Sequence, residues 1–315
     1  MISKINEIKN EVAKVVIGQE KMIDGLLIGL LCEGHILIEG VPGLAKTTTV
    51  KALSQSLGLN FKRAQFTPDL LPSDILGAQI YDPQTNEFKI KRGPIFTNLL
   101  LADEINRAPA KVQSALLEVM QERQVTIGEE SFKLEAPFFV MATQNPVEQE
   151  GVYQLPEAQL DRFMLKLDVG YNTKDEELEI ARRISSGKYE QIAAVISRDD
   201  LVKLKEAVKA IHVDAEVEEY MITLVDASRN PAQYGLDEIA EYIQYGASPR
   251  VSIDMFKAVK AMAFLRGKDF VTPVDVAYIV KEVMHHRLVL TYEAEAEGIT
   301  TDFIIDKIVK TVPIP

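Results

Sequence analysis

The sequence has a single cysteine, Cys32, so an intramolecular disulfide is excluded. This residue ends the apolar stretch 26–32, where we expect a buried and unreactive thiol. The stretch is too short for a membrane-spanning helix, which takes roughly 20 apolar residues, and Gly29 interrupts it. The chain also lacks a CxxC pair, an HExxH motif and the residue order of a serine hydrolase. None of these chemistries is therefore indicated.

The amino-terminal segment lacks the unbroken apolar core of a signal peptide, so we expect a cytoplasmic protein. Positive charge is scarce, because 35 Lys and Arg face 47 Asp and Glu, which gives a net charge of −12 and a pI near 5.0. Such a surface repels phosphate backbones and anionic lipids. We therefore expect no membrane partner, and nucleic acid is a minority hypothesis that a local basic patch could still support.

The length of 315 residues favours one large domain and one smaller domain. Between about residues 35 and 170, apolar runs alternate with helix-like stretches, which is typical of a parallel sheet flanked by helices. We therefore predict an α/β core over residues 1–172 and a smaller all-α lid over 173–315. The candidate strands, each expected to be buried on both faces, are 35–39, 59–63, 98–103, 138–143 and 163–167.

Two polar segments between these strands, 80–90 and 125–134, are predicted to be hairpin insertions because turn residues break them. After residue 170 helical patterns dominate. Thr173 and Glu176 have the spacing of a capping box, so we expect the acidic residues there to begin a helix rather than bind a metal. Further helices are indicated by Thr272-Pro273 and by the apolar stripe Leu201, Leu204, Val208 and Ile211.

A phosphate-binding loop is the strongest motif in the chain, and it lies directly between a predicted strand and a predicted helix. Small residues allow successive backbone N–H groups and the helix N-terminus to face a triphosphate. Lys46 is expected to hold the β and γ phosphates, and Thr47 to place its hydroxyl on Mg²⁺. Alanine stands at position 45 in place of a glycine and would be strained at a positive φ. The motif comprises Gly40, Val41, Pro42, Gly43, Leu44, Ala45, Lys46 and Thr47, with Thr48 following, and a plain strand-to-helix turn is the alternative.

Two carboxylates, Asp103 and Glu104, end the apolar run 99–102. The carboxyl ends of parallel strands are where ligands bind in such sheets. Asp103 can hold Mg²⁺ through water, and Glu104 can orient and deprotonate the attacking water. An exposed acidic turn is the alternative. Together with the loop, the pair predicts a P-loop NTPase that uses ATP and Mg²⁺.

These two motifs together resemble the AAA+ ATPases, and further stretches along nearly the whole chain are similar to the MoxR family. They are 65–74 (QFTPDLLPSD), 102–109 (ADEINRAP), 117–125 (LEVMQERQV) and the ending, where 292–298 (YEAEAEG) follows 286–288 (HRL). In that family alanine is usual at the position of Ala45.

The resemblance implies further roles. Asn145 resembles sensor 1, which positions water beside the γ phosphate, although Asn-Pro is also a common turn pair. Arg162 resembles the arginine finger that serves a neighbouring subunit, with a surface salt bridge to Asp161 or Asp168 as the alternative. Arg250 resembles sensor 2, and the sequence leaves open whether it acts on its own nucleotide. Ile17 and Gly18 resemble the segment that cups adenine, which a helix-to-helix turn explains nearly as well.

The leading hypothesis is thus a ring-forming ATPase, expected to be a hexamer, that remodels or activates client proteins. The resemblance also implies partners with a von Willebrand factor A domain. The alternatives are a nucleic-acid motor, favoured only by the basic cluster Lys89, Lys91 and Arg92, and a slowly hydrolysing nucleotide-gated scaffold. The adjacent His285 and His286 diverge by roughly 100° on a helix, so we expect lid surface or packing rather than a shared metal.

Overall fold

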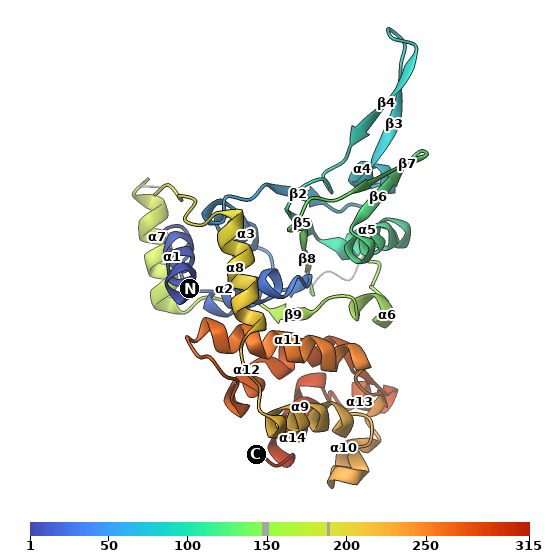
Figure 1. Ribbon diagram of the computed structural model, residues 1–315. Helices are drawn as coiled ribbons and strands as arrows, with labels where there is room; N and C mark the ends of the chain where they lie inside the picture. Colours follow the sequence, from blue (N-terminus) through green and yellow to red (C-terminus); the bar gives the residue numbers. More distant parts are fainter. Residues whose placement is uncertain (147–150, 188–189) are drawn as a thin grey trace.

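The computed structural model describes residues 1–146, 151–187 and 190–315. Its core is a five-stranded parallel sheet in the order β2-β5-β8-β1-β9, which confirms the predicted fold class (Figure 1). Each predicted strand is present with its ends shifted by at most two residues. The observed strands are β1 (Ile36–Glu39), β2 (Phe61–Gln65), β5 (Leu99–Asp103), β8 (Phe139–Gln144) and β9 (Leu165–Asp168).

The central strands are buried on both faces, as their continuous apolar sequence predicts. In β5, Leu99 and Leu101 face one hydrophobic cluster, whereas Leu100 and Ala102 face a second cluster across the sheet. The prediction of full burial is wrong for β2. This strand forms one edge of the sheet and exposes Lys62 and Arg63.

Helices cover both faces of the sheet. On one face, the first hydrophobic cluster packs the sheet against α1 (Ile2–Ala13), α2 (Glu20–Cys32) and α3 (Lys46–Ser56). On the other face, the second cluster packs the sheet against α5 (Ala110–Glu122). The short helices of the core are α4 (Pro72–Leu76), η1 (Ile105–Arg107) and α6 (Glu157–Leu160).

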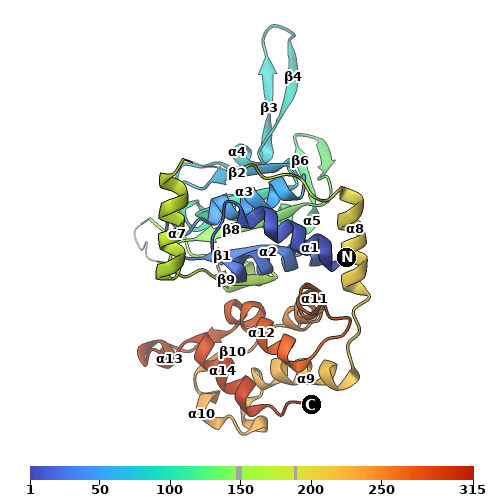
Figure 2. The same ribbon diagram turned by 90° about the vertical axis from the view of Figure 1, so that its left-hand side faces the viewer.

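Both predicted hairpins are present. The first consists of β3 (Gly77–Asp82) and β4 (Glu87–Arg92), and the second of β6 (Gln124–Ile127) and β7 (Glu130–Lys133). In Figure 2 the first hairpin projects from the core on the side opposite the carboxyl-terminal helices. It therefore extends away from the body of the molecule.

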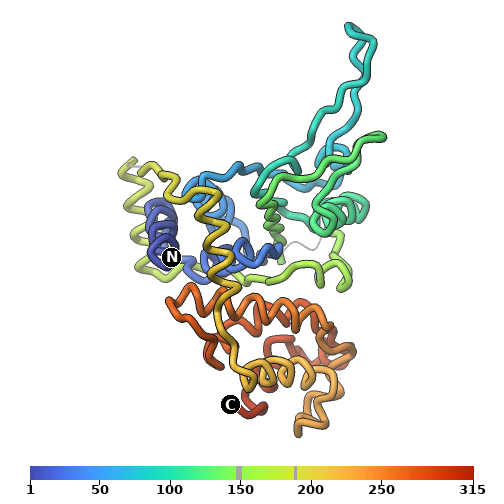
Figure 3. The backbone as a smooth tube through the Cα atoms, viewed as in Figure 1, coloured from blue at the N-terminus to red at the C-terminus, as the bar shows by residue number. Residues whose placement is uncertain are grey.

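The helices after β9 divide between the core and the lid. α7 (Lys174–Ser185) lies beside α1, and the predicted capping box of Thr173 and Glu176 begins it (Figure 1). α8 (Arg198–Lys209) packs against α2, and Figure 3 shows the chain entering the lid after it. Because α7 lies on the core, the boundary at residue 172 stays a prediction.

The lid is helical apart from one small sheet in which β10 (Ile243–Tyr245) pairs with β11 (Val289–Leu290). The expected apolar stripe of α8 is buried, and a helix does begin at Pro273. The lid elements are α9 (Ala215–Ala227), η2 (Pro231–Tyr234), α10 (Asp237–Ala240), α11 (Pro249–Leu265), α12 (Pro273–Met284), η3 (His285–Arg287), α13 (Tyr292–Ala296) and α14 (Thr301–Thr311).

The cysteine and the paired histidines are packing groups. The Cys32 thiol donates to the Lys257 carbonyl oxygen at 3.3 Å, and burial raises its pKa to about 12. His285 and His286 are buried and bond through Nε2 to the carbonyl oxygens of Lys166 and Phe163, at 3.1 and 2.9 Å. They fasten the lid to the strand segment around β9. In the described part of the chain, no helix combines the length and apolar character needed to cross a membrane.

Candidate functional site

The phosphate-binding loop connects β1 to α3, which begins at Lys46 as predicted. Gly40 packs so closely on the end of β9 that a Cβ there would lie 2.7 Å from the Val169 carbonyl oxygen. Gly43 has a φ of +90°. Ala45 has a φ of +55°, so the residue in place of the second glycine is indeed held in the left-handed region. The loop thus carries backbone strain directly before the helix N-terminus.

The Lys46 amine lies among the acidic residues of the site. It donates to the Gly40 carbonyl oxygen at 2.6 Å across the loop. Burial lowers the pKa of Lys46, while the nearby Asp103, Glu104 and Glu39 oppose that shift. A half-buried cation in this position can exchange the carbonyl oxygen for phosphate oxygens.

Asp103 is held by two neighbouring strands. Its Oδ1 accepts from the Thr143 hydroxyl at 2.6 Å, and its Oδ2 lies 2.6 Å from Nη2 of Arg63. Arg63 comes from the exposed edge strand β2, whose register places it two residues before the partner of Asp103. The negative charge of Asp103 is thus balanced by a cation at the open side of the site.

Glu104 is constrained through both its backbone and its side chain. Its φ of +56° is unusual for a residue with a side chain, and its N–H donates to the Thr143 hydroxyl at 2.9 Å. Its Oε2 accepts from the Gln65 amide at 2.7 Å and lies 3.3 Å from Nη1 of Arg107. These contacts hold the carboxylate toward β2. Gln65 is a site residue that our sequence analysis did not identify.

Asn145 follows β8 and is 5% exposed, so it lies at the same edge of the sheet as the loop and the two carboxylates. Thr143, two residues earlier in the chain, bonds both Asp103 and Glu104. The ends of β1, β2, β5 and β8 therefore bring the phosphate-binding loop, Asp103, Glu104 and Asn145 to one edge of the sheet.

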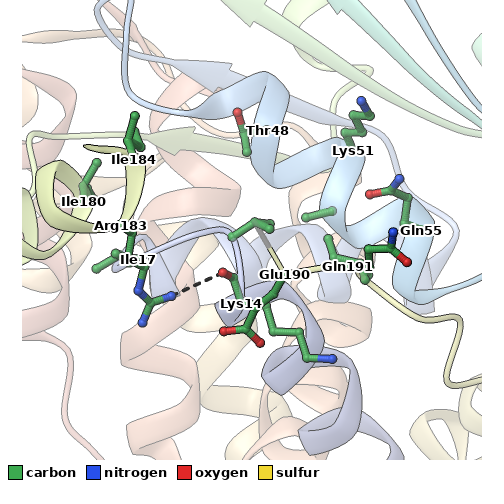
Figure 4. A pocket seen from close by; sticks show the side chains of 13 residues that line it. Lys14, Ile17, Thr48, Lys51, Gln55, Ile180, Arg183, Ile184, Glu190 and Gln191 are labelled. Carbon is green, nitrogen blue, oxygen red and sulfur yellow. Dashed lines mark hydrogen bonds between the residues drawn. The ribbon is translucent and has the colours of Figure 1, made fainter. Parts of the chain in front are cut away.

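A cavity of about 700 Å³ opens beside the loop, between α1, α3 and α7 (Figure 4). Ile17 lines it as predicted, and Thr48 connects it to the loop. Gly18 has a φ of +67° and packs so tightly that a Cβ would lie 2.6 Å from the Asn172 side chain. A cavity of this volume, whose lining mixes apolar side chains with polar and charged ones, suits a nucleoside.

Three residues of α7 line this cavity and were not predicted as site residues: Ile180, Arg183 and Ile184. The Arg183 guanidinium donates to the Ala13 and Lys14 carbonyl oxygens at 3.0 and 3.3 Å, closing α7 onto the end of α1. The amphipathic sequence of α7 predicts a helix, but it does not show the surface on which this helix packs. The remaining lining residues are Lys14, Val15, Lys51, Ala52, Gln55, Glu190, Gln191 and Ile192.

Arg162 lies apart from these groups, at the opposite edge of the sheet, where the parallel strands begin. It precedes β9, whereas the phosphate-binding loop follows β1, and the two strands are paired in parallel from Ile36 with Leu165 to Glu39 with Asp168. The length of β9, roughly 13 Å for four residues, therefore separates the two edges. The Arg162 Nη1 donates to the Leu117 carbonyl oxygen at 3.1 Å.

Arg250 lies beside Arg162 rather than beside the loop. Its Nη1 donates to the Asp161 carbonyl oxygen at 3.2 Å and lies 3.3 Å from Oδ2 of the same residue. In Figure 1, α6 with this segment is at the right, whereas α1 and α7, which border the cavity, are at the left. The structure thus brings the predicted site residues together in two groups, one at each edge.

Comparison with known proteins identifies the family to which the chain belongs. Residues 35–165 match the family described as "ATPase family associated with various cellular activities (AAA)", and residues 237–308 match an AAA lid domain. Chaperone MoxR1 of Mycobacterium tuberculosis is 47% identical over 97% of this chain and 81% of its own length. The chain belongs to the MoxR family of AAA+ ATPases. Protein MoxR of Paracoccus denitrificans is 30% identical over 96% of this chain and 93% of its own.

The fold of this MoxR-family chain also matches a solved structure. A crystal structure of a candidate ATPase from Cytophaga hutchinsonii superposes with a TM-score of 0.94 and is 51% identical, covering 100% of this chain and 96% of that chain. AAA family membership implies nucleotide binding and ATPase activity, and the relationship to MoxR1 implies a chaperone-like role.

The residues present fit a magnesium nucleotide. Thr47 and Asp103 offer the oxygen ligands that Mg²⁺ prefers, and few of them, as expected when phosphates and water complete the coordination. Within the described ranges no cluster of three or more His, Cys, Asp or Glu could form a cage for a metal by itself.

Proposed function

We propose that the chain hydrolyses ATP with Mg²⁺ at sites shared between neighbouring copies in a ring, which we expect to be a hexamer. The observation that carries this proposal is the position of Arg162 and Arg250 at the sheet edge opposite the phosphate-binding loop. Neither guanidinium can reach a phosphate bound at the loop of its own copy, because the length of β9 lies between them. In a head-to-tail ring, one edge of each copy meets the other edge of the next.

Each group has a defined task in this proposal. Ile17, Gly18 and the cavity beside them hold the nucleoside, and the loop from Gly40 to Thr48 holds the phosphates, with Lys46 leaving the Gly40 carbonyl oxygen for the β and γ phosphates. Thr47 and Asp103 would hold a magnesium ion, which would supply positive charge to neutralise the phosphates.

Hydrolysis then requires a base, a water-positioning group and added positive charge. Glu104 accepts the proton of the attacking water, so its carboxylate has to leave the Gln65 amide and turn toward the nucleotide. Asn145 positions this water without adding charge. Arg162 and Arg250 of the adjacent copy neutralise the charge that develops on the transferred phosphoryl group.

The cellular task follows from family membership rather than from the site. We propose a cytoplasmic machine that remodels or activates client proteins, and partners with a von Willebrand factor A domain remain part of this proposal. The structure weakens the support for the nucleic-acid alternative. Lys89 pairs with Asp82 at 2.5 Å, and Arg92 stacks over Phe96 and Phe132, at 4.9 and 5.2 Å from the ring centroids. Two cations of the basic cluster are thus engaged within the chain.

The decisive experiment measures ATP hydrolysis against protein concentration for the wild type, Arg162→Ala, Glu104→Gln and a mixture of the two variants. We expect specific activity to rise with concentration and each variant alone to be nearly inactive. The mixture should regain activity, because Arg162 of the Glu104→Gln copy can complete the intact site of its neighbour.

The matched control replaces Glu104→Gln in the mixture by the double variant Arg162→Ala/Glu104→Gln, which offers no arginine and should restore nothing. Activity that is independent of concentration, together with an active Arg162→Ala variant, would show a self-contained ATPase and overturn the shared site.

A further inference from the structure

Asp161 directly precedes Arg162, and three side chains of the lid converge on it. Its Oδ1 accepts from the Ser248 hydroxyl at 2.8 Å, and its Oδ2 lies 3.3 Å from Nη1 of Arg250. Nε of Arg287 lies 3.2 Å from Oδ1. Ser248 and Arg250 come from the start of α11 and Arg287 from η3, so two separate lid elements meet one core carboxylate.

The backbone on both sides of Arg162 is held by the same lid elements. Nη2 of Arg287 donates to the carbonyl oxygens of Asp161 and Phe163, at 2.9 and 2.8 Å. His286 also donates to the Phe163 carbonyl oxygen, at 2.9 Å. The peptide between Asp161 and Arg162 is thus held directly, and the Phe163 carbonyl group is fixed on the other side, so the backbone of Arg162 has little freedom to move.

Arg287 is suited to act as a fixed anchor. Its side chain is 1% exposed, and a buried guanidinium requires charged and hydrogen-bonding partners. Asp254 of α11 supplies one at 2.6 Å, so the anchor stays paired within the lid even when Asp161 changes. Arg250 differs, because its side chain is 42% exposed and Asp161 is the partner that restrains it.

We propose that Asp161 is a positioning residue that holds Arg162 and Arg250 as one unit, set by the lid of the copy that carries them. The inference rests on the proposed shared site. Its consequence is directional: the lid of one copy sets the hydrolysis rate in the adjacent copy rather than in its own site. A shift of the lid moves Ser248, Arg250 and Arg287 together, and with them the segment of Arg162.

The test places Asp161→Asn in only one of the two copies that share a site. Asparagine keeps the shape and the bond to Ser248 but removes the charge that Arg250 needs. The acceptor copy carries Arg162→Ala and has an intact loop, and the donor copy carries Glu104→Gln and has intact arginines. We expect Asp161→Asn in the donor to lower the restored kcat at least about tenfold, since misplacing a catalytic group by about 1 Å costs as much as a hundredfold. The same change in the acceptor should leave restoration and the KM for ATP unaltered.

Two further variants keep the result interpretable. Ser248→Ala in the donor removes a single bond to Asp161 and should give a smaller loss in the same direction, even where Asp161→Asn prevents assembly. Lys21→Met in the donor removes another contact between core and lid, the 2.5 Å pair with Glu282, and should not lower restoration.

Equal restoration with and without Asp161→Asn in the donor overturns this inference alone, as does a loss that arises from the acceptor. If unmodified Glu104→Gln fails to restore Arg162→Ala, the shared site itself is overturned, and this inference with it.

Discussion

The two edges of the sheet are built in different ways. At the carboxyl edge, where the parallel strands end, contacts within the core hold the site: the Thr143 hydroxyl donates to the Asp103 carboxylate and accepts from the Glu104 N–H, Gln65 donates to the Glu104 carboxylate, and Arg63 balances the charge of Asp103. Two residues with side chains there, Ala45 and Glu104, have positive φ. This edge is arranged in advance by the fold, with local strain where a ligand is expected to bind.

At the amino edge, the contacts around Arg162 come largely from the lid, through Asp161 and the carbonyl groups beside it. No strained residue marks this segment among the described residues. From this difference we predict that nucleotide binding depends on the core, whereas the hydrolysis rate depends on how the lid holds Arg162 and Arg250. Variants at each edge separate these two dependences.

Arg162→Ala tests the difference most strongly. We expect kcat to fall by about a thousandfold, because an arginine that neutralises the transferred phosphoryl group typically contributes that much or more. The affinity for ATP should be unchanged, since Arg162 lies at the far edge from the loop. Steady-state kinetics and titration with a fluorescent nucleotide measure the two quantities.

The contrasting variant is Lys46→Met at the carboxyl edge, which should lose nucleotide affinity. Arg123→Ala is the matched control, because this exposed arginine pairs with Glu33 and should affect neither quantity. A large loss of ATP affinity in Arg162→Ala would contradict the separation of the two edges.

The amino edge also contains a buried histidine that makes stability depend on pH. His35 is 7% exposed, its Nε2 bonds the Met120 carbonyl oxygen at 3.0 Å, and its Nδ1 accepts from the Val140 N–H at 3.0 Å. Burial lowers its pKa to about 4, from the usual 6.5. The unfolded chain therefore binds a proton at a higher pH than the folded chain does.

The contribution of neutral, buried His35 to the free energy of unfolding is complete above pH 6.5 and is lost as the pH falls toward 4. Between pH 7 and 5 we expect a loss of about 2 kcal/mol in the free energy of unfolding. Urea unfolding at both pH values measures it. His286 acts in the same direction, because burial lowers its pKa too. His35→Gln should reduce the difference between the two pH values, and an unchanged difference would exclude His35 as its source.

The sequence predicts the carboxyl edge well because its chemistry lies in contiguous segments. The order strand, small-residue loop, Lys46 and Thr47 defines a phosphate site locally, and an apolar strand that ends in Asp103 and Glu104 marks its partner. The five strands and both hairpins follow from the alternation of apolar runs and turns along the chain.

Contacts between segments far apart in the chain could not be predicted from the sequence. Gln65 meets Glu104 across 39 residues, and Ser248 meets Asp161 across 87. α7 has no fully buried residue, so its pattern could not show that it closes the cavity beside the loop. Such pairs depend on strand order and lid placement rather than on any local periodicity.

The smallest predicted effect concerns the strain of the carboxyl edge. Ala45 is exposed and has a φ of +55°, a conformation that costs a residue with a Cβ about 1–2 kcal/mol. Glycine removes this cost but adds chain entropy to the unfolded state, so we expect Ala45→Gly to raise the free energy of unfolding by roughly 0.5–1 kcal/mol. The matched control is Ala181→Gly, at an exposed position within α7, which should lower it by about 1 kcal/mol because glycine disfavours a helix interior. Urea unfolding of both variants at pH 7 shows whether each one raises or lowers the free energy of unfolding. If both variants are destabilised, the loop does not store the strain that distinguishes this edge from the other.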